Sequence, residues 1–87
     1  MVEPTVIEER IREHVPDVAH LTIEDLTGGK DHYQAVVVSP AFEGMTRVQQ
    51  HQMIYRALGE LMAGPVHALA LSTYTPDAWS KRGKSLL

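Results

Sequence analysis

Five histidines and no cysteine are the chemically most distinctive feature of this 87-residue sequence. Neutral imidazole is the commonest metal ligand in proteins, whereas thiolate ligands and disulfides are excluded in a chain without cysteine. His32 opens the segment HYQAVVV, and His67 lies near the start of PVHALALSTY. Because zinc takes three or four protein ligands, these two histidines would supply half of a metal site. The pair predicts an open half-site that another molecule completes.

Each of these histidines also has a structural interpretation. His67 is in period with Leu69 and Leu71, a pattern typical of a partly buried histidine that is bonded to a backbone carbonyl. His32 follows a glycine-rich loop, where a solvent-facing residue is the ordinary expectation. His51 falls on the apolar stripe of a predicted helix, so we interpret it as a packing residue.

The first element that the sequence predicts is a helix over residues 5–15. Thr5 and Glu8 form a capping-box pattern at its start. Pro16 and Asp17 end it. Its apolar residues recur with helical spacing, at Ile7, Ile11 and Val15.

Two strands follow, at residues 19–24 and 32–38. Apolar and polar residues alternate in the first, and β-branched residues dominate the second. The loop between them is short, which predicts an antiparallel hairpin.

A long helix over residues 46–63 comes next, and Gly64-Pro65 ends it. Its predicted apolar stripe consists of Val48, His51, Tyr55, Leu58 and Met62, and Ile54 and Leu61 widen it. A third strand, residues 66–74, completes the pattern. A crossover that contains a helix normally joins parallel strands. The second and third strands therefore start at one end of a sheet, which would bring His32 and His67 together if their side chains share a face.

The order α-β-β-α-β predicts one small α/β (α+β) domain over residues 1–79. Thr75 and Pro76 could open a final helical turn, and residues 80–87 are predicted to be a flexible C-terminal tail. Helices are expected to pack on one three-stranded sheet of mixed direction.

Charge and hydropathy argue against several classes of protein. The formal net charge is −3, whereas a nucleic-acid binder more often carries a basic stripe. No apolar run approaches the length of a membrane span, and the start of the chain does not resemble a secretory signal. We therefore expect a cytoplasmic protein without a membrane partner. The sequence also lacks a cysteine nucleophile, a Walker loop and an H-E-x-x-H motif, so we expect no enzymatic activity.

Two stretches resemble the BolA family: VVVSPAFEGMTRVQQHQMIYRALGELM and VHALALSTYTPDAW. The resemblance covers residues 5–79. Its most specific parts are Ser39-Pro40 with Phe42-x-Gly44, the helix that contains His51, the pair His67-Ala68, and Thr75-Pro76-x-x-Trp79. It implies a fold similar to a class II KH domain, which agrees with the order of elements above.

The resemblance also implies a cofactor and partners. BolA-like proteins partner monothiol glutaredoxins, and the two proteins share a [2Fe–2S] cluster with glutathione. His67 matches the invariant ligand histidine of the family. His32 matches the second ligand, a histidine or cysteine in the loop between the first two strands. The implied role is non-enzymatic iron–sulfur trafficking, or redox and iron regulation. The sequence does not decide whether the apo protein forms a homodimer.

The alternative function is a DNA-binding transcriptional regulator that uses the KH-like or helix-turn-helix surface. Two departures from the family pattern argue against it. The helix histidine is flanked by Gln50 and Gln52 instead of basic residues, and the GxxG nucleic-acid loop of KH domains is missing. The candidate phosphate contacts are Arg47, Arg56, Lys81, Arg82 and Lys84.

Overall fold

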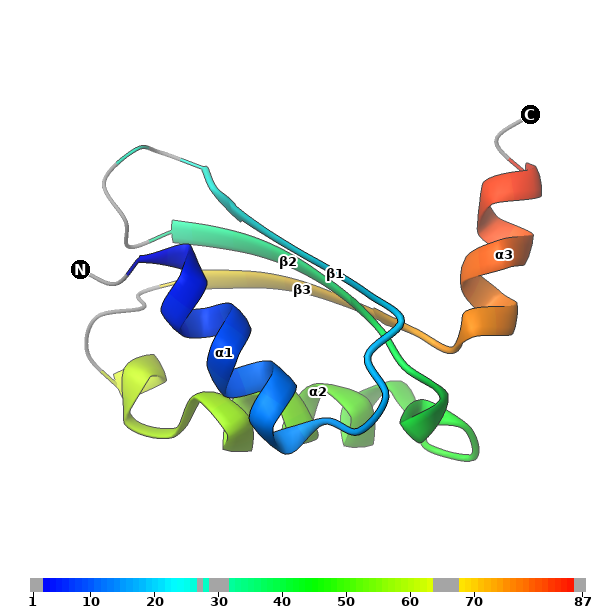
Figure 1. The fold of residues 1–87 in the computed structure, drawn as a ribbon, viewed down its shortest axis with the longest axis horizontal. Helices are drawn as coiled ribbons and strands as arrows, with labels where there is room; N and C mark the ends of the chain where they lie inside the picture. Colours follow the sequence, from blue (N-terminus) through cyan, green and yellow to red (C-terminus); the bar gives the residue numbers. More distant parts are fainter. Residues whose placement is uncertain (1–2, 27, 29–31, 64–67, 86–87) are drawn as a thin grey trace.

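The computed structural model describes residues 3–26, 28, 32–63 and 68–85 (Figure 1). In this part of the chain, two helices cover one face of a three-stranded sheet, and a third helix lies beyond the end of the last strand. Short 3-10 helices follow β2 and α2, at Pro40–Phe42 and Gly59–Ala63. The main elements are α1 (Pro4–His14), β1 (His20–Asp25), β2 (His32–Val38), α2 (Arg47–Leu58), β3 (Ala68–Tyr74) and α3 (Pro76–Ser85).

The sheet has the strand order β1-β2-β3 and is mixed. β1 and β2 are antiparallel, and β2 and β3 are parallel. The parallel register pairs the Cα atoms of His32 and Ala68 at one end and those of Val38 and Tyr74 at the other. The predicted hairpin, the parallel crossover and the α+β class with helices on a three-stranded sheet are therefore confirmed.

Strand β2 divides its side chains between the two faces of the sheet. Tyr33, Ala35 and Val37 are buried beneath the helices, whereas His32 and Gln34 are exposed on the other face. This alternation is the two-residue period of a strand. Position 32 is therefore directed to the face that α1 and α2 leave open.

The core lies between the sheet and the two covering helices. Ile7 and Ile11 of α1 meet Ile54 and Leu58 of α2, and Phe42 fills the space after β2; all five are completely buried. Full burial of such side chains stabilises the fold by roughly 1.5–3 kcal/mol each. Among the described helices, none has the length and apolar character that a membrane span requires.

The predicted capping box of α1 is wrong. The helix begins at Pro4 with Glu3 as its N-cap, and no side chain caps it. Proline favours the first helical position because its φ angle is preset and it has no N–H to leave unpaired. Glu8 instead forms an ion pair with Arg12, one turn later, at 3.2 Å.

Helix α2 begins as predicted but ends earlier. Thr46 and Gln49 form a capping box, with Gln49 N–H to Thr46 Oγ1 at 3.1 Å and Thr46 N–H to Gln49 Oε1 at 2.9 Å. The α-helix stops at Leu58 because Gly59 has a φ of +54°, a conformation that glycine adopts without steric cost. The chain then tightens into the 3-10 helix up to Ala63, so the predicted end at Gly64-Pro65 is wrong for the α-helix.

The predicted apolar stripe of α2 is wrong in part. Val48 is 65% exposed and Tyr55 is 39% exposed, so both lie on the solvent side. The buried residues of the helix are Ile54, Ala57 and Leu58. The apolar residues of this helix occupy more than one face, and the sequence pattern does not say which face meets the sheet.

Helix α3 extends into the segment that we predicted to be a flexible tail, because its last helical residue is Ser85. Trp79 lies against both outer strands: its ring stacks on that of His20 in β1 at 5.0 Å and meets that of Tyr74 in β3 at 5.3 Å. Lys81 and Asp77 form an ion pair one turn apart, at 3.1 Å. These contacts give the final helix an anchor on the sheet.

Candidate functional site

His32 is positioned by the base of the β1–β2 hairpin. Its carbonyl oxygen accepts a hydrogen bond from the Leu26 N–H at 2.9 Å. On the other side of the hairpin, Asp25 Oδ1 accepts a hydrogen bond from the Gly28 N–H at 3.0 Å. The exposed imidazole of His32 therefore projects from a backbone position that is fixed by the sheet.

His67, the other predicted ligand, lies outside the described residues. The description resumes at Ala68, the next residue in the chain, whose Cα is the register partner of His32. The strands that follow the two predicted ligands therefore begin at the same end of the sheet. That the two imidazoles converge on one point stays a prediction.

The described residues also bear on the cofactor that the sequence implies. They contain no group of three or more histidine, cysteine, aspartate or glutamate side chains that could hold a metal ion. A cluster shared with another protein needs an exposed donor, and His32 is exposed at the rim of the sheet. This residue fits a half-site that a second molecule completes.

The predicted phosphate contacts are not brought together in the described part of the chain. Arg47 and Arg56 are nine positions apart on α2, which is two and a half turns, so they leave the helix on opposite sides. Lys81 is already paired with Asp77. The side chains of Arg82 and Lys84 lie outside the described residues.

Gln50, one of the two departures from the family pattern, has a structural role. Its Nε2 donates to the carbonyl oxygens of Met45 at 3.0 Å and Phe42 at 3.4 Å. Its Oε1 accepts from the Thr73 hydroxyl at 2.6 Å. The glutamine thus connects α2, the turn before it and β3, whereas Gln52 is exposed.

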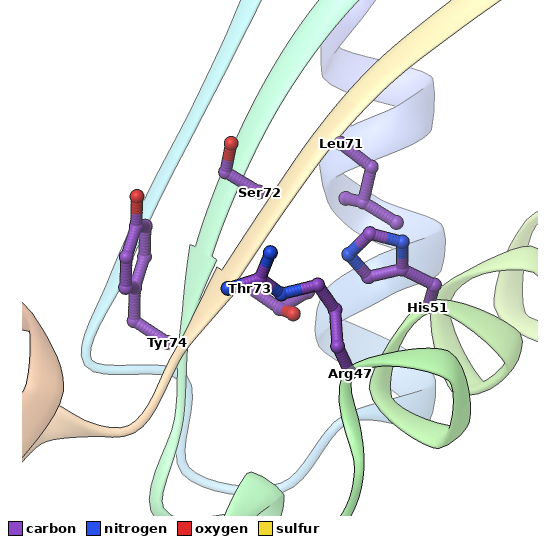
Figure 2. A pocket seen from close by; sticks show the side chains of 6 residues that line it. All are labelled: Arg47, His51, Leu71, Ser72, Thr73 and Tyr74. Atoms are coloured by element: carbon purple, nitrogen blue, oxygen red, sulfur yellow. The ribbon is translucent and has the colours of Figure 1, made fainter.

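A pocket of about 160 Å³ lies between the start of α2 and the second half of β3 (Figure 2). Nε2 of His51 is buried there without a hydrogen-bond partner, unlike any other described side-chain nitrogen or oxygen. Burial, and then the positive charge of Arg47, lower the pKa of His51 below its ordinary value of 6.5. Our interpretation of His51 as a packing residue missed this pocket. Its lining residues are Arg47, His51, Leu71, Ser72, Thr73 and Tyr74.

The spacing of Arg47 and His51 indicates that their side chains lie on one face of the helix, because residues four apart are neighbours on a helix. What the sequence did not show is which strand faces them.

Comparison with known proteins finds relatives whose names include BolA or Bol-like. BolA-like protein 1 of Mus musculus is 48% identical over 52 residues, which are 60% of this chain and 38% of that protein. The protein named DNA-binding transcriptional regulator BolA of Escherichia coli (strain K12) is 38% identical over 74 residues, 85% of this chain and 61% of that protein. The crystal structure of a Bol-like protein from Babesia bovis has a TM-score of 0.84 at 27% identity and covers 95% of both chains.

The matches differ in how much of each relative they cover. The chain spans only 38–42% of the length of four mammalian relatives named BolA-like protein 1. The family model described as BolA-like protein matches residues 4–78, which is most of the chain. Both this match and the fold agree with the resemblance found in the sequence, and the chain belongs to the BolA-like family.

Proposed function

We propose that this protein is a non-enzymatic partner of a monothiol glutaredoxin and that the two share a bridging [2Fe–2S] cluster. His67 and His32 would be the ligands from this chain. The glutaredoxin cysteine and glutathione would supply the thiolates, since this chain has no cysteine. The role would be iron–sulfur trafficking, or redox and iron regulation, in the cytoplasm.

The observation that carries this proposal is the register of the parallel strands. His32 is paired with Ala68, and Ala68 is joined to His67 by one peptide bond. Consecutive Cα atoms are about 3.8 Å apart, and neighbouring strands are separated by about 4.8 Å. This register supports the proposal, because the residue next to His67 in the chain lies opposite His32.

Histidine ligands suit a cluster that is transferred to another protein or that acts as a sensor. Histidine ligation of one iron raises the reduction potential of a [2Fe–2S] cluster relative to all-thiolate ligation. A histidine must lose its proton from the ligating nitrogen, so cluster binding weakens as the pH falls. The two imidazoles would hold the cluster at the rim of the sheet, where His32 is exposed.

Reconstitution tests the proposal directly. The protein is mixed anaerobically with a monothiol glutaredoxin, glutathione, iron and sulfide, and visible absorption and circular dichroism are recorded. We expect a cluster spectrum from the mixture, and His67→Ala and His32→Ala should each alter it. His14→Ala, a change of an exposed histidine on α1, is the control and leaves the spectrum intact. If His67→Ala gives the wild-type spectrum, the ligand assignment fails.

A second candidate function is regulation of transcription by DNA binding. It is favoured by the name of the Escherichia coli relative, which is 38% identical over 85% of this chain. Duplex DNA would then shift in a mobility assay, and the affinity would fall steeply with salt because phosphate contacts release counterions. Arg56→Gln and Lys81→Gln are expected to weaken such binding for all DNA sequences alike. Binding that neither salt nor these changes affect would exclude the candidate.

A further inference from the structure

We propose that the pocket between α2 and β3 binds a small oxyanion, a phosphate or a carboxylate group, between the Arg47 guanidinium and His51 Nε2. This site is not part of the proposed cluster site and does not depend on it. The pocket lies beside Leu71–Tyr74, in the second half of β3, whereas His32 is paired with the first residue of that strand. At about 3.3 Å per residue, Thr73 is roughly 16 Å along the strand from Ala68.

The two nitrogen-bearing side chains face the same space. Arg47 and His51 are one turn apart on α2. Figure 2 shows the imidazole pointing from the helix toward β3, with the guanidinium beside it and over the position of Thr73. The side chains of Ser72 and Tyr74 point to the other side of the strand. The polar side chains in the pocket are therefore Arg47, His51 and Thr73.

In the described part of the chain, no hydrogen bond reaches His51 Nε2 and no ion pair reaches Arg47. His51 Nε2 is buried without a partner, and a buried polar atom without a hydrogen bond costs free energy. No ion pair joins Arg47 to a described carboxylate. The guanidinium is the charged group that faces His51; from β3 the titratable side chain is Tyr74, which points away. A negative group would satisfy both side chains, and arginine binds carboxylate and phosphate with two parallel hydrogen bonds.

The open edge of β3 adds a further donor. The Tyr74 carbonyl accepts from the Ser39 N–H at 3.0 Å, so the Tyr74 peptide groups point toward β2. Peptide groups alternate along a strand, and those of Thr73 and Leu71 therefore point to the edge where the described sheet ends. The Thr73 hydroxyl already donates to Gln50, so its backbone N–H is the donor that this residue can offer.

The size of the pocket limits the ligand. A water molecule occupies about 30 Å³ of the liquid, so a volume of about 160 Å³ admits one phosphate or carboxylate group with its hydration. A neighbouring hollow shares Arg47, Thr73 and Tyr74, and gives room for the part of a ligand beyond its anionic group.

Nuclear magnetic resonance titration tests the proposal. The ¹⁵N-labelled protein is titrated with sodium phosphate, with sodium acetate and with sodium chloride at matched ionic strength. We expect saturable shifts at the Leu71 and Thr73 amides and at the His51 ring nitrogens for phosphate or acetate, and none for chloride. Saturation by phosphate alone assigns the site to phosphate groups, and saturation by both assigns it to oxyanions in general. Shifts that are equal for all three salts would overturn the proposal.

Matched variants make the test specific. Arg47→Gln and His51→Gln are each expected to weaken binding at least tenfold, while Arg56→Gln, on the opposite side of α2, leaves it unchanged. Acetate keeps one charge between pH 6 and pH 8, so tighter acetate binding at pH 6 would report protonation of His51. If Arg47→Gln and Arg56→Gln bind alike, or if only duplex DNA shifts these signals, the pocket is not a small-anion site.

Discussion

Two histidines at opposite ends of the β2–β3 pair differ in what surrounds them. His32, at the start of β2, is exposed and belongs to the open face of the sheet. His51 lies beside the end of β3, where its Nε2 is buried and Arg47 is its charged neighbour. In our proposal, this exposed imidazole binds a cluster that is shared with another protein. An imidazole whose Nε2 is buried next to a cation suits the anion that we propose for the pocket. The two sites thus differ in burial and in neighbouring charge.

The two ends also differ in how much of the fold depends on them. Gln50 and Ser39 connect separate segments near the pocket: the Ser39 hydroxyl donates to the Pro16 carbonyl at 2.6 Å and accepts from the Ala41 N–H at 3.0 Å. At the other end, two described hydrogen bonds, Leu26 N–H to the His32 carbonyl and Gly28 N–H to Asp25 Oδ1, hold the base of one hairpin. Substitutions at the pocket end should therefore cost stability, and substitution of His32 should not.

The largest effect is expected for Leu58→Ala. Leu58 is completely buried between α2, which carries the pocket residues, and the rest of the core. Loss of such a side chain leaves a cavity and should lower the free energy of unfolding by about 2–5 kcal/mol in urea denaturation. The control is Val48→Ala on the exposed side of the same helix, which should change it by less than about 0.5 kcal/mol. Equal losses would mean that α2 does not pack on the sheet as described.

Gln50→Ala should have the next largest effect. The change leaves the Met45 carbonyl and the Thr73 hydroxyl without their partner, which should cost about 1–3 kcal/mol. Gln52→Ala, on the exposed side of α2, is the matched control and should have almost no effect. If denaturation gives the same stability for both variants, Gln50 does not connect α2 to β3.

The pH dependence of stability tests the environment of His51. Its pKa is lowered in the folded protein, so the unfolded chain takes up the proton first as the pH falls through 6.5. The wild-type protein should therefore lose stability between pH 7.5 and pH 5.5, and His51→Gln should lose less over the same range. Gln52→Ala, at an exposed position on the same helix, removes no titratable group and should follow the wild type. Parallel curves for the wild type and His51→Gln would contradict the burial of this imidazole.

The smallest effect on stability is expected for His32→Ala, within about 0.5 kcal/mol of the wild type, because the side chain is exposed. Thermal and urea denaturation of the apo protein measure this directly. A loss comparable to that of Gln50→Ala would show that His32 is part of the fold rather than a residue held for a partner.

The sheet could be predicted from the sequence because its signals are local. β2 has the predicted bounds, and the helix-containing crossover implied the parallel pairing that places His32 opposite Ala68. The face of α2 that packs on the sheet was not predictable, since Val48 and Tyr55 are apolar but exposed. Which face is buried depends on how α1 and the sheet meet the helix, and this is tertiary information.

The two candidate sites also differ in how far the sequence predicts them. The position of His32 follows from strand order alone, whereas the pocket depends on Arg47 and His51 meeting β3, far along the chain. The extent of α3 was missed for a similar reason, because the ring of Trp79 stacks on that of His20, in the first strand.

The most direct test of the central claim is pulsed electron paramagnetic resonance on the reduced heterodimer. This chain alone is labelled with ¹⁵N-histidine, and the cluster is reconstituted with an unlabelled glutaredoxin and glutathione. The account predicts hyperfine couplings from two imidazole nitrogens, of which His32→Ala removes one and His67→Ala removes the other. A cluster that shows no ¹⁵N coupling, or the same couplings in both variants, would contradict it.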